Sequence, residues 1–560
     1  MALRINFNYE SASTHTALKA NERMMNQSLL RLSTGLRILS AQDDAAGLFI
    51  ADQLSVVAAG LYQGNQNIQT GLSALRIAEN SLGQIFTKLQ AMYTRVESAA
   101  NDINDVNARA ALQREIDNFR DAIDKIAADT EYNGIHLLNG DFQGKKIHYG
   151  ARKDQTVTVN ISNMRASQLG AYLETGNGGV STKFEAQTSG GSLANFTANV
   201  NTVANNFVLS GTSEYVRIAG TTVYQGDATT NYLIDAKSLA DAINSNDTLS
   251  NLGITATASN TSTADTTYNT ANVVNASATA AAGASDETFT VYLNFYIGDG
   301  STSFQVQLGT ITVAAGSTTV SKNIADLDTL VNRINTAAGA AGAPIVATNS
   351  DGKLQLTTND GETIGIEAQV TAPAGTSAAP DVTIDFSQLL QGGNNALQVA
   401  SALAAGTSEY GGQVKVGTIN IGGIDSFLFE YAGVSGTTSG NVGFNFTDTS
   451  GTNVGLTSIT AIDVSSNSNA ETYLLVVEKA LQKVDKVRSQ IGAIMNNLQS
   501  IYDAQKTAYD NTKEAENVIR NVDYAEEMSR FTTFQIRMQS GIAMLAQANQ
   551  LPQLVLQLLR

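Results

Sequence analysis

Residues 61–96 read LYQGNQNIQTGLSALRIAENSLGQIFTKLQAMYTRV. Apolar residues recur in this stretch every seven positions, with a second apolar series three positions later. Heptad spacing is typical of a coiled-coil helix, because it keeps one apolar seam facing a partner. The first series comprises Leu61, Ile68, Leu75, Leu82, Leu89 and Val96, and the second Ala78, Ile85, Met92 and Ala99.

Further helices are predicted on both sides of this stretch. After a polar break at 101–105, apolar residues with 4-3-4-3 spacing (Leu112, Ile116, Phe119, Ile123, Ile126) predict a second helix that folds back on the first. Two apolar seams also run through 477–522, and shorter helices are expected at roughly 3–35 and 524–549. Periodicity alone leaves open whether these helices form a hairpin inside one globular protein or pack against other copies.

Charge divides the chain of 560 residues into three parts. Residues 1–165 hold 17 basic and 17 acidic groups, and residues 466–560 hold 10 and 10. The middle holds 7 basic and 24 acidic groups, so it carries the whole net charge of -17, and it holds 35 of the 47 glycines. Balanced charge suits surfaces that pack against copies of themselves, whereas uncompensated negative charge keeps copies apart.

The middle region is predicted to be mainly β. Strand-like runs such as 292–296, 304–308, 414–416 and 427–429 alternate with Gly, Asn, Ser and Thr turns. Two short helical segments, 238–244 and 328–335, each end in Ile-Asn and precede strand-like text, which indicates an internal duplication. Stretches 257–285 and 371–380, rich in small and polar residues, are expected to be long loops.

Composition disfavours several classes of function. Zero Cys excludes disulfides and thiol chemistry, and His15, His136 and His148 form no metal-binding pattern, so we expect no cofactor, no metal and no enzyme activity. The negative charge argues against nucleic acid or an anionic membrane surface as partner. No run approaches about 20 apolar residues, so no membrane span is expected. Asp43 and Asp44 lack the partners of a catalytic pair, which favours contacts at a helix end or between subunits.

Six short motifs lie toward the two ends of the chain. They are RLSTGLRI (31–38), SAQDDAAGL (40–48), TEYNG (130–134), LLNG (137–140), NVDYAEE (521–527) and LAQANQ (545–550). In their text, order and position these motifs resemble the terminal signatures of bacterial flagellins. The segments 238–244 and 328–335 are similar to the flagellin IN repeat.

The resemblance implies an α+β multidomain fold, with N- and C-terminal helices paired in a coiled-coil bundle and central β-rich outer domains. It divides the chain into a filament-core helix (1–45), the N-terminal part of a helical inner domain (46–175), a β-rich outer region of two to three subdomains (176–465), the C-terminal part of the inner domain (466–521) and a second filament-core helix (522–560).

The implied function is that of a structural subunit which self-assembles into an extracellular flagellar filament for motility. The implied route is type III export without a cleaved signal, and the implied partners are an export chaperone, cap proteins and hook-junction proteins. O-glycosylation of the middle region is compatible with the resemblance, although no motif selects sites. The residues assigned to filament assembly are Leu32, Leu36, Asp43, Asp44, Leu61, Ile68, Leu75, Leu82, Leu89, Ile491, Ile494, Leu498, Ile501, Phe531 and Leu545.

Two alternatives remain within this reading. A hook-filament junction protein shares the terminal helices, and an adhesive outer region could be displayed on a filament. The resemblance also bears on an immune receptor of the Toll-like class, which contacts an Arg and a Leu on the first long helix of flagellins that activate it. This sequence has Ala91 and Arg95 at those two places. A third contact of the family is acidic, and this sequence retains it as Glu115. Because the other two are lost, we expect weak or no activation of the receptor.

Overall fold

The structure is a computed structural model that describes residues 8–101, 103–180, 208–209, 215–225, 232–233, 235–298, 300, 302–432, 444–446 and 450–558. The chain divides into two compact units. We call Met1–Leu82, Thr130–Ser162 and Val487–Arg560 the terminal unit, and Gly83–Asp129 and Asn163–Lys486 the central unit. Both chain ends therefore belong to one unit, and most of the middle of the sequence belongs to the other.

The terminal unit is built from long helices. It contains α1 (Tyr9–Thr34), the first part of α2 (Ala45–Ala99), the last part of α8 (Asn467–Arg520) and α9 (Tyr524–Leu558). Its two small hairpins are β1 (Glu131–Tyr132) with β2 (Ile135–His136) and β3 (Lys145–His148) with β4 (Thr156–Val159). Heptad residues such as Ile68, Leu75 and Ile491 are buried, whereas Ile494 and Ile501 of the second seam of α8 are half-buried.

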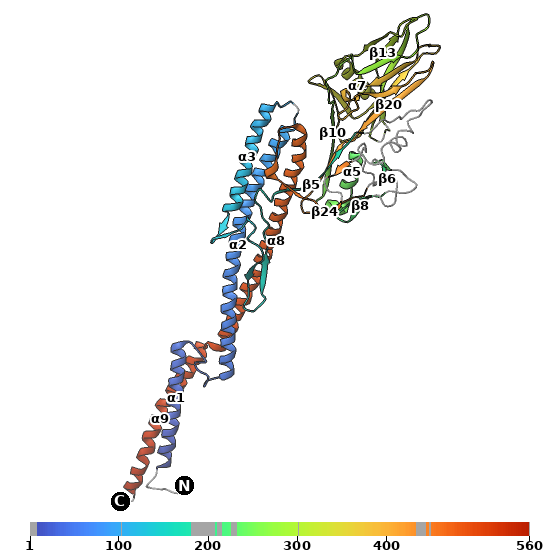
Figure 1. Cartoon of the computed structure of the whole chain (residues 1–560). Helices are drawn as coiled ribbons and strands as arrows, with labels where there is room; N and C mark the ends of the chain where they lie inside the picture. The colour runs from blue at the N-terminus through green and yellow to red at the C-terminus, as the bar shows by residue number, and fades with distance from the viewer. Residues whose placement is uncertain are drawn as a thin grey trace. The chain divides into compact units, whose positions relative to one another are not determined.

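Helices α1 and α9 lie side by side and antiparallel (Figure 1). Asn8 Nδ2 donates to the Ala548 carbonyl at 2.9 Å, and Asn21 Nδ2 donates to the Phe534 carbonyl at 2.8 Å. Further along, the Ser28 hydroxyl bonds the buried carboxylate of Glu527. The two ends of the chain are thus joined by polar side chains at three levels.

Glycine lets the β3–β4 hairpin approach α2 closely. A Cβ added to Gly64 would stand 2.1 Å from the carbonyl oxygen of Tyr149, so only glycine fits there. One turn further along α2, Asn67 Nδ2 donates to the His148 carbonyl at 3.0 Å and fixes the hairpin against the helix.

In the central unit, α3 (Val106–Asp129) folds back on the end of α2, as the 4-3-4-3 spacing predicted. Arg109 Nε donates to the Ala99 carbonyl at 3.1 Å, and the Lys88 ammonium lies 5.8 Å from the centre of the Phe119 ring. The buried residues Ile116 and Ile123 occupy the apolar face of α3.

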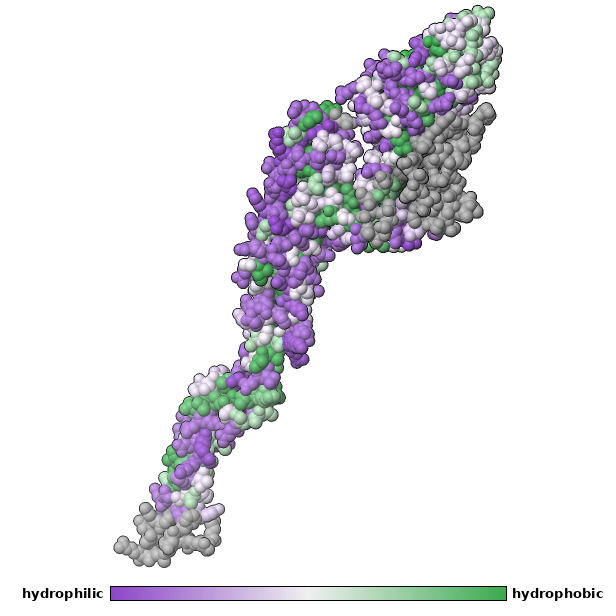
Figure 2. All heavy atoms as spheres, viewed as in Figure 1, coloured by the Kyte–Doolittle hydropathy of each residue, from purple (hydrophilic) through white to green (hydrophobic). Residues whose placement is uncertain are grey.

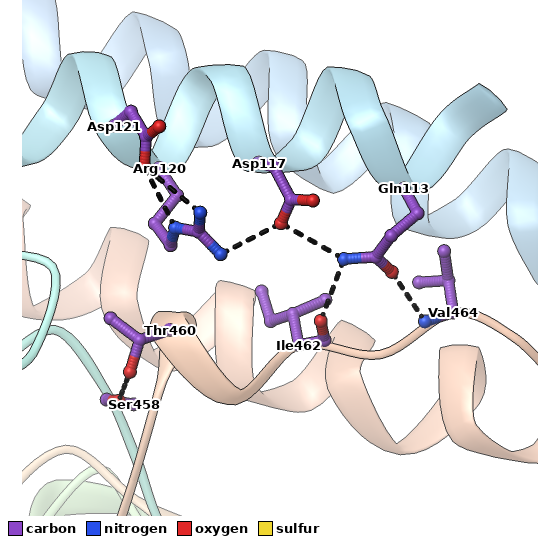
Figure 3. Close-up of polar contacts among 8 residues, drawn as sticks. All are labelled: Gln113, Asp117, Arg120, Asp121, Ser458, Thr460, Ile462 and Val464. Atoms are coloured by element: carbon purple, nitrogen blue, oxygen red, sulfur yellow. Dashed lines mark hydrogen bonds and ion pairs between the residues drawn. The ribbon is translucent and has the colours of Figure 1, made fainter. Parts of the chain in front are cut away.

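Gln113 connects α3 to the segment that leads into α8. Its Nε2 donates to the Ile462 carbonyl at 3.0 Å and to Asp117 at 3.2 Å, while its Oε1 accepts from the Val464 amide at 2.9 Å (Figure 3). Arg120 holds Asp117 from the other side at 2.8 Å. The Gln113 side-chain amide therefore pairs with both the Ile462 carbonyl and the Val464 N–H of the segment before α8.

The rest of the central unit is β-rich, and the named strands in its described part pair antiparallel. A seven-stranded sheet has the order β15-β16-β10-β21-β5-β23 with β25 also on β5, and a five-stranded sheet has the order β14-β13-β12-β17-β20. Smaller sheets are β11-β18-β19, β24-β22-β7-β8 and β6-β9. The strands are β5 (Gly170–Gly178), β6 (Val208–Leu209), β7 (Tyr215–Ile218), β8 (Thr221–Gln225), β9 (Tyr232–Leu233), β10 (Thr255–Thr263), β11 (Val274–Ala278), β12 (Glu287–Ile297), β13 (Thr302–Val313), β14 (Val320–Ile324), β15 (Ile345–Ser350), β16 (Lys353–Thr358), β17 (Ile364–Thr371), β18 (Pro380–Ile384), β19 (Leu397–Ala400), β20 (Ser408–Lys415), β21 (Thr418–Gly423), β22 (Leu428–Ala432), β23 (Phe444–Phe446), β24 (Ser450–Asn453) and β25 (Leu456–Ser458).

The α+β class is confirmed, and one expectation about the middle is wrong. Residues 257–285 were expected to form a long loop, but they include most of β10 and all of β11. Strand β10 pairs with β21, and β11 pairs with β18. Segment 371–380 does form a loop, with only its first and last residues in β17 and β18. The 257–263 segment suits a strand because three of its residues are threonine, whose β-branched side chain favours the extended backbone.

The two Ile-Asn segments form matching helix-strand pairs. Helix α5 (Ala236–Asn244), followed by the short α6 (Asp247–Asn251), precedes β10, and α7 (Leu327–Ala341) precedes β15. In the first pair, Asn244 exchanges two hydrogen bonds with the backbone of Ala256, at 2.8 and 2.9 Å. In the second, Asn335 does the same with Ala347, at 2.8 Å for both bonds, and the separation is 12 residues in each case. The predicted duplication is therefore visible as the same asparagine contact made twice.

This contact gives a testable prediction. Asn335→Ala should lower the free energy of unfolding of the central unit by about 1 to 2 kcal/mol, because two backbone groups of Ala347 lose their partner. Denaturant unfolding followed by circular dichroism measures it. Asn332→Ala, an exposed change on the same helix, is the control and should leave stability unchanged. Equal stability of both variants would show that the asparagine contact is dispensable.

Candidate assembly surface

Exposed large apolar side chains are concentrated on the terminal unit. Of the 20 such residues in the described part of the chain, 16 lie there and only Ile103, Val106, Leu252 and Val346 lie in the central unit. Extensive exposed apolar surface marks a site that other molecules cover. Figure 2 shows apolar surface gathered where α2 begins. We call these 16 residues the terminal apolar surface: Tyr9, Met24, Leu29, Leu30, Phe49, Ile50, Val56, Tyr62, Ile77, Ile135, Val518, Tyr524, Met528, Ile536, Ile542 and Met544.

The residues predicted for assembly fall into two groups. Buried ones form the cores of the helical units, and the others are half-buried at the surface or at helix ends. The buried group comprises Leu61, Ile68, Leu75, Leu82, Leu89, Ile491 and Leu498, and the half-buried group Leu32, Leu36, Asp43, Ile494, Ile501, Phe531 and Leu545. Asp44 is exposed.

Sequence reasoning missed most of the terminal apolar surface. Phe49, Ile50 and Val56 lie on α2 outside its heptad series and are 66%, 49% and 68% exposed. An available signal was that α2 is apolar on more than one face, which a single seam does not explain.

The turn between α1 and α2 pairs with the turn between α8 and α9. Helix α1 ends at Gly35, whose φ of 73° is the left-handed conformation that favours glycine. The Arg37 amide donates to the Arg520 carbonyl at 2.7 Å, and the Val522 amide donates to the Gly35 carbonyl at 3.0 Å. Two of the quoted motifs, from opposite ends of the sequence, therefore form one backbone-bonded junction.

Asp43 and Asp44 organise this junction. Asp44 accepts from the Gly47 amide at 2.9 Å and so caps the start of α2. Asp43 accepts from the amides of Leu39 and Ser40 at 3.2 and 3.1 Å, and from Gln27 at 2.7 Å.

Charged groups from both turns line one cleft. It has a volume of about 680 Å³ and is bordered by Asp43, Asp44, Arg31 and Arg37 on one side and by residues from 514 to 530 on the other. Arg31 lies 3.7 Å from Asp43. Burial tends to raise the pKa of Asp43, but these hydrogen bonds and Arg31 outweigh it and hold the pKa below its ordinary value of 3.8.

The lowered pKa sets the direction of a pH effect. A carboxylate with a depressed pKa in the folded state stabilises that state above the unfolded pKa, and the contribution is lost as the pH falls through the folded pKa. Asp43→Asn should therefore lower the thermal midpoint of the terminal unit at pH 7, with the difference from the parent chain shrinking below about pH 3.8. Calorimetry at pH 7 and pH 3 tests it, with exposed Gln42→Asn as control. A pH-independent difference would refute the assigned role.

Helix α2 meets the length and composition test for a membrane span, with a window of mean hydropathy 1.5 that is 22% buried. The expectation that no membrane span would be found considered only unbroken apolar runs, and polar residues interrupt this stretch of α2. Core helices share this length and composition, so the feature assigns no membrane role to α2.

The predicted receptor-contact residues lie together in the central unit. Arg95 Nε is 2.5 Å from Glu115 Oε2, and both side chains are about half exposed, at 46% and 50%. Ala91 is half-buried on the same helix as Arg95. Arg95 thus forms an ion pair with Glu115, the one predicted receptor contact that matches the family.

Fold and surface together define a class of protein: paired terminal helices with uncovered apolar faces, and a β-rich region inserted between them. The family described as bacterial flagellin N-terminal helical region matches residues 5–143, and the bacterial flagellin C-terminal helical region matches residues 474–559. Over the full length of both chains, this chain is 47% identical to the flagellin of Aquifex pyrophilus and 46% identical to that of Aquifex aeolicus. A solved structure of FliC from Burkholderia pseudomallei covers 76% of this chain and 99% of its own, at 13% identity and a TM-score of 0.25.

The chain belongs to the bacterial flagellin family, whose members are structural subunits of the flagellar filament.

Proposed function

We propose that this chain assembles through its terminal unit into an extracellular flagellar filament that serves motility, with the acidic residues 176–465 displayed outside. The observation that carries the proposal is the terminal apolar surface, which holds 16 of the 20 exposed large apolar residues of the described chain. The charge distribution supports it, because the ends are neutral and the middle holds 24 acidic against 7 basic groups.

Electron microscopy after seeding purified chain with filament fragments tests the proposal. Filaments should grow under polymerising salt. Monomers that persist under those conditions would contradict it.

Two alternatives make different predictions. A hook-filament junction protein would be present in a few copies per cell, whereas a filament subunit is present in great excess; the relatives named flagellin favour the subunit. An adhesive outer region would be revealed by deleting residues 166–465. Filaments that still assemble but no longer attach to surfaces would support an adhesive role in addition to the structural one.

Export and assembly partners follow from the same proposal. We expect type III export, an export chaperone, a cap and hook-junction proteins as partners, and a structural role in place of enzyme activity. Comparison of the intact mass of filament-derived protein with the 58.9 kDa chain would reveal any O-glycosylation.

We further expect weak recognition by the Toll-like receptor of this family. Ala91 lacks the cationic anchor, and Arg95 is paired with Glu115 where an apolar contact is implied, so docking must break that ion pair. Loss of one interface anchor costs more than about 1 kcal/mol, and desolvating Arg95 against an apolar contact adds to that cost. Because about 1.4 kcal/mol is a factor of ten, purified monomer should be at least about tenfold less potent in a reporter-cell assay than a flagellin with the full motif. The double variant Ala91→Arg with Arg95→Leu should regain potency. Full potency of the parent chain would refute the expectation.

A further inference from the structure

The five-stranded sheet of the central unit has one apolar face and one polar face. Along β12, alternate residues such as Phe289, Val291 and Leu293 are buried in the apolar core. The residues between them are polar or aromatic, and they point to the opposite face because side chains alternate along a strand. Ile311 of β13 and Ile366 and Val370 of β17 belong to the same core, whereas residues 364–368 of β17 and 411–414 of β20 are buried at consecutive positions.

The strand register aligns these polar-face residues in rows. Tyr292 of β12 pairs with Gln307 of β13 on one side and with Gln369 of β17 on the other, and Gln369 pairs with Tyr410 of β20. One row therefore crosses four strands as Gln-Tyr-Gln-Tyr, over three inter-strand steps or about 14 Å. Gln307 is exposed, while the other three side chains are half-buried.

A second row lies beside the first. Asn294 of β12 pairs with Gln305 of β13 and with Glu367 of β17. Gln305 is exposed, Asn294 is 5% exposed and Glu367 is fully buried beneath the face.

Hydrogen bonds hold the polar groups in place. Gln305 Nε2 donates to Asn294 Oδ1 and to Gln369 Oε1, both at 2.8 Å. Gln369 Nε2 in turn donates to the Thr371 hydroxyl at 3.2 Å, and Asn294 Nδ2 lies 3.4 Å from Glu367. The amide side chains are thus orientated before any ligand arrives, which lowers the entropy cost of binding.

A groove continues this face at the edge of the sheet. It has a volume of about 510 Å³ and lies between β13 and α7, with Gln305 and Gln307 on one wall and Asn332, Arg333 and Thr336 on the other. Strand β14 pairs with β13 only from Gly309 to Val313, so in the described part of the chain no strand covers the edge beside this groove. Arg333 Nη1 donates to the edge carbonyl of Gln307 at 2.6 Å. Figure 1 shows β13, α7 and β20 in the same part of the fold.

We propose that this polar face and its groove bind a neutral oligosaccharide. Amides and hydroxyls both donate and accept hydrogen bonds, so they match the hydroxyl groups of a sugar, and tyrosine rings offer flat surfaces to its apolar C–H groups. The only acidic group in the two rows, Glu367, is buried and hydrogen-bonded, so the two rows present no exposed charge to select an ion. Arg333 on the groove wall is a cation, and it donates to the Gln307 carbonyl. The acidic field of the middle region repels polyanions and acidic peptides but does not oppose an uncharged ligand.

This proposal does not depend on filament assembly, since the site lies within one chain. A chain that does not bind the sugar could still form filaments, and a chain that fails to polymerise could still bind the sugar.

The chain contains no tryptophan, which allows a direct test. Tyr292→Trp places a single tryptophan in the first row. Titration of the full-length monomer with neutral hexasaccharides of glucose, galactose, mannose, xylose and N-acetylglucosamine should change its emission saturably with at least one of them. The same sugar should retard the parent chain in affinity electrophoresis through a gel that contains the corresponding polysaccharide.

Two variants serve as controls. Tyr215→Trp, at a half-buried tyrosine on a different sheet, should show no response to the sugars. Gln305→Ala in the Tyr292→Trp background should weaken binding at least tenfold while the chain remains folded. No response to any of the five sugars by a folded Tyr292→Trp chain would overturn the proposal, as would an equal response at Tyr215→Trp or a preference for sulfated polysaccharide.

Discussion

Leu82→Asp should strongly destabilise the helical bundle and prevent filament formation. Leu82 is 0% exposed and lies in the middle of an apolar series whose neighbours, Leu75 and Leu89, are 1% and 0% exposed. An unpaired charge buried at such a position typically costs about 3 to 5 kcal/mol, a large share of the stability of a domain. We expect a lower denaturant midpoint for the monomer and no filaments in a seeded assay.

Thr87→Asp is the matched control, because it puts the same side chain at an exposed position of the same helix. It should leave folding and assembly near parent levels. A normal filament yield from Leu82→Asp would show that the heptad series is not buried in the working protein.

Val56→Asp should separate assembly from folding. Val56 is 68% exposed in the single chain, so the charge remains hydrated and the free energy of unfolding should change by less than about 0.5 kcal/mol. In a polymer that covers the terminal apolar surface, the same charge would lose its water without gaining a partner. We expect a folded monomer that fails to elongate seeds, or whose critical concentration rises at least tenfold.

Gln53→Asp introduces the same charge one turn earlier at a position that is exposed and already polar, and it should polymerise normally. Ile536→Asp, at 63% exposure on α9, extends the test to the other end of the chain. If both apolar-to-acidic variants assembled at parent rates, the terminal apolar surface would not be the assembly surface.

Periodicity predicted the helical part of the fold well. The heptad residues Ile68, Leu75 and Ile491 are buried because a seven-residue repeat defines one face of a helix without reference to distant sequence. The Ile-Asn segments were also found, since each is a local pattern that builds a complete helix-strand contact.

Long-range pairing could not be predicted in this way. Strand β5 pairs with β21, and Arg37 bonds the backbone of Arg520, across hundreds of residues that leave no local signal. The second apolar face of α2 was visible in the sequence, but its exposure was not, because an apolar residue such as Phe49 looks the same whether its partner is in the same chain or in another. The polar sheet face was missed for a related reason: Tyr292, Gln369 and Tyr410 become neighbours only through the register of three strands.

The terminal unit is assembled from three separate segments, and the last begins at Val487. Asn8 meets Ala548, its partner 540 residues away, only after the whole chain is available. Contacts of such long range form slowly, because the intervening chain must first be brought together. A chain that is still emerging from the ribosome therefore has an incomplete terminal unit, and so has any fragment that stops before α9. We expect this order of synthesis to act as a quality check: prematurely terminated chains lack half of the α1–α9 pair and should be unable to enter a polymer.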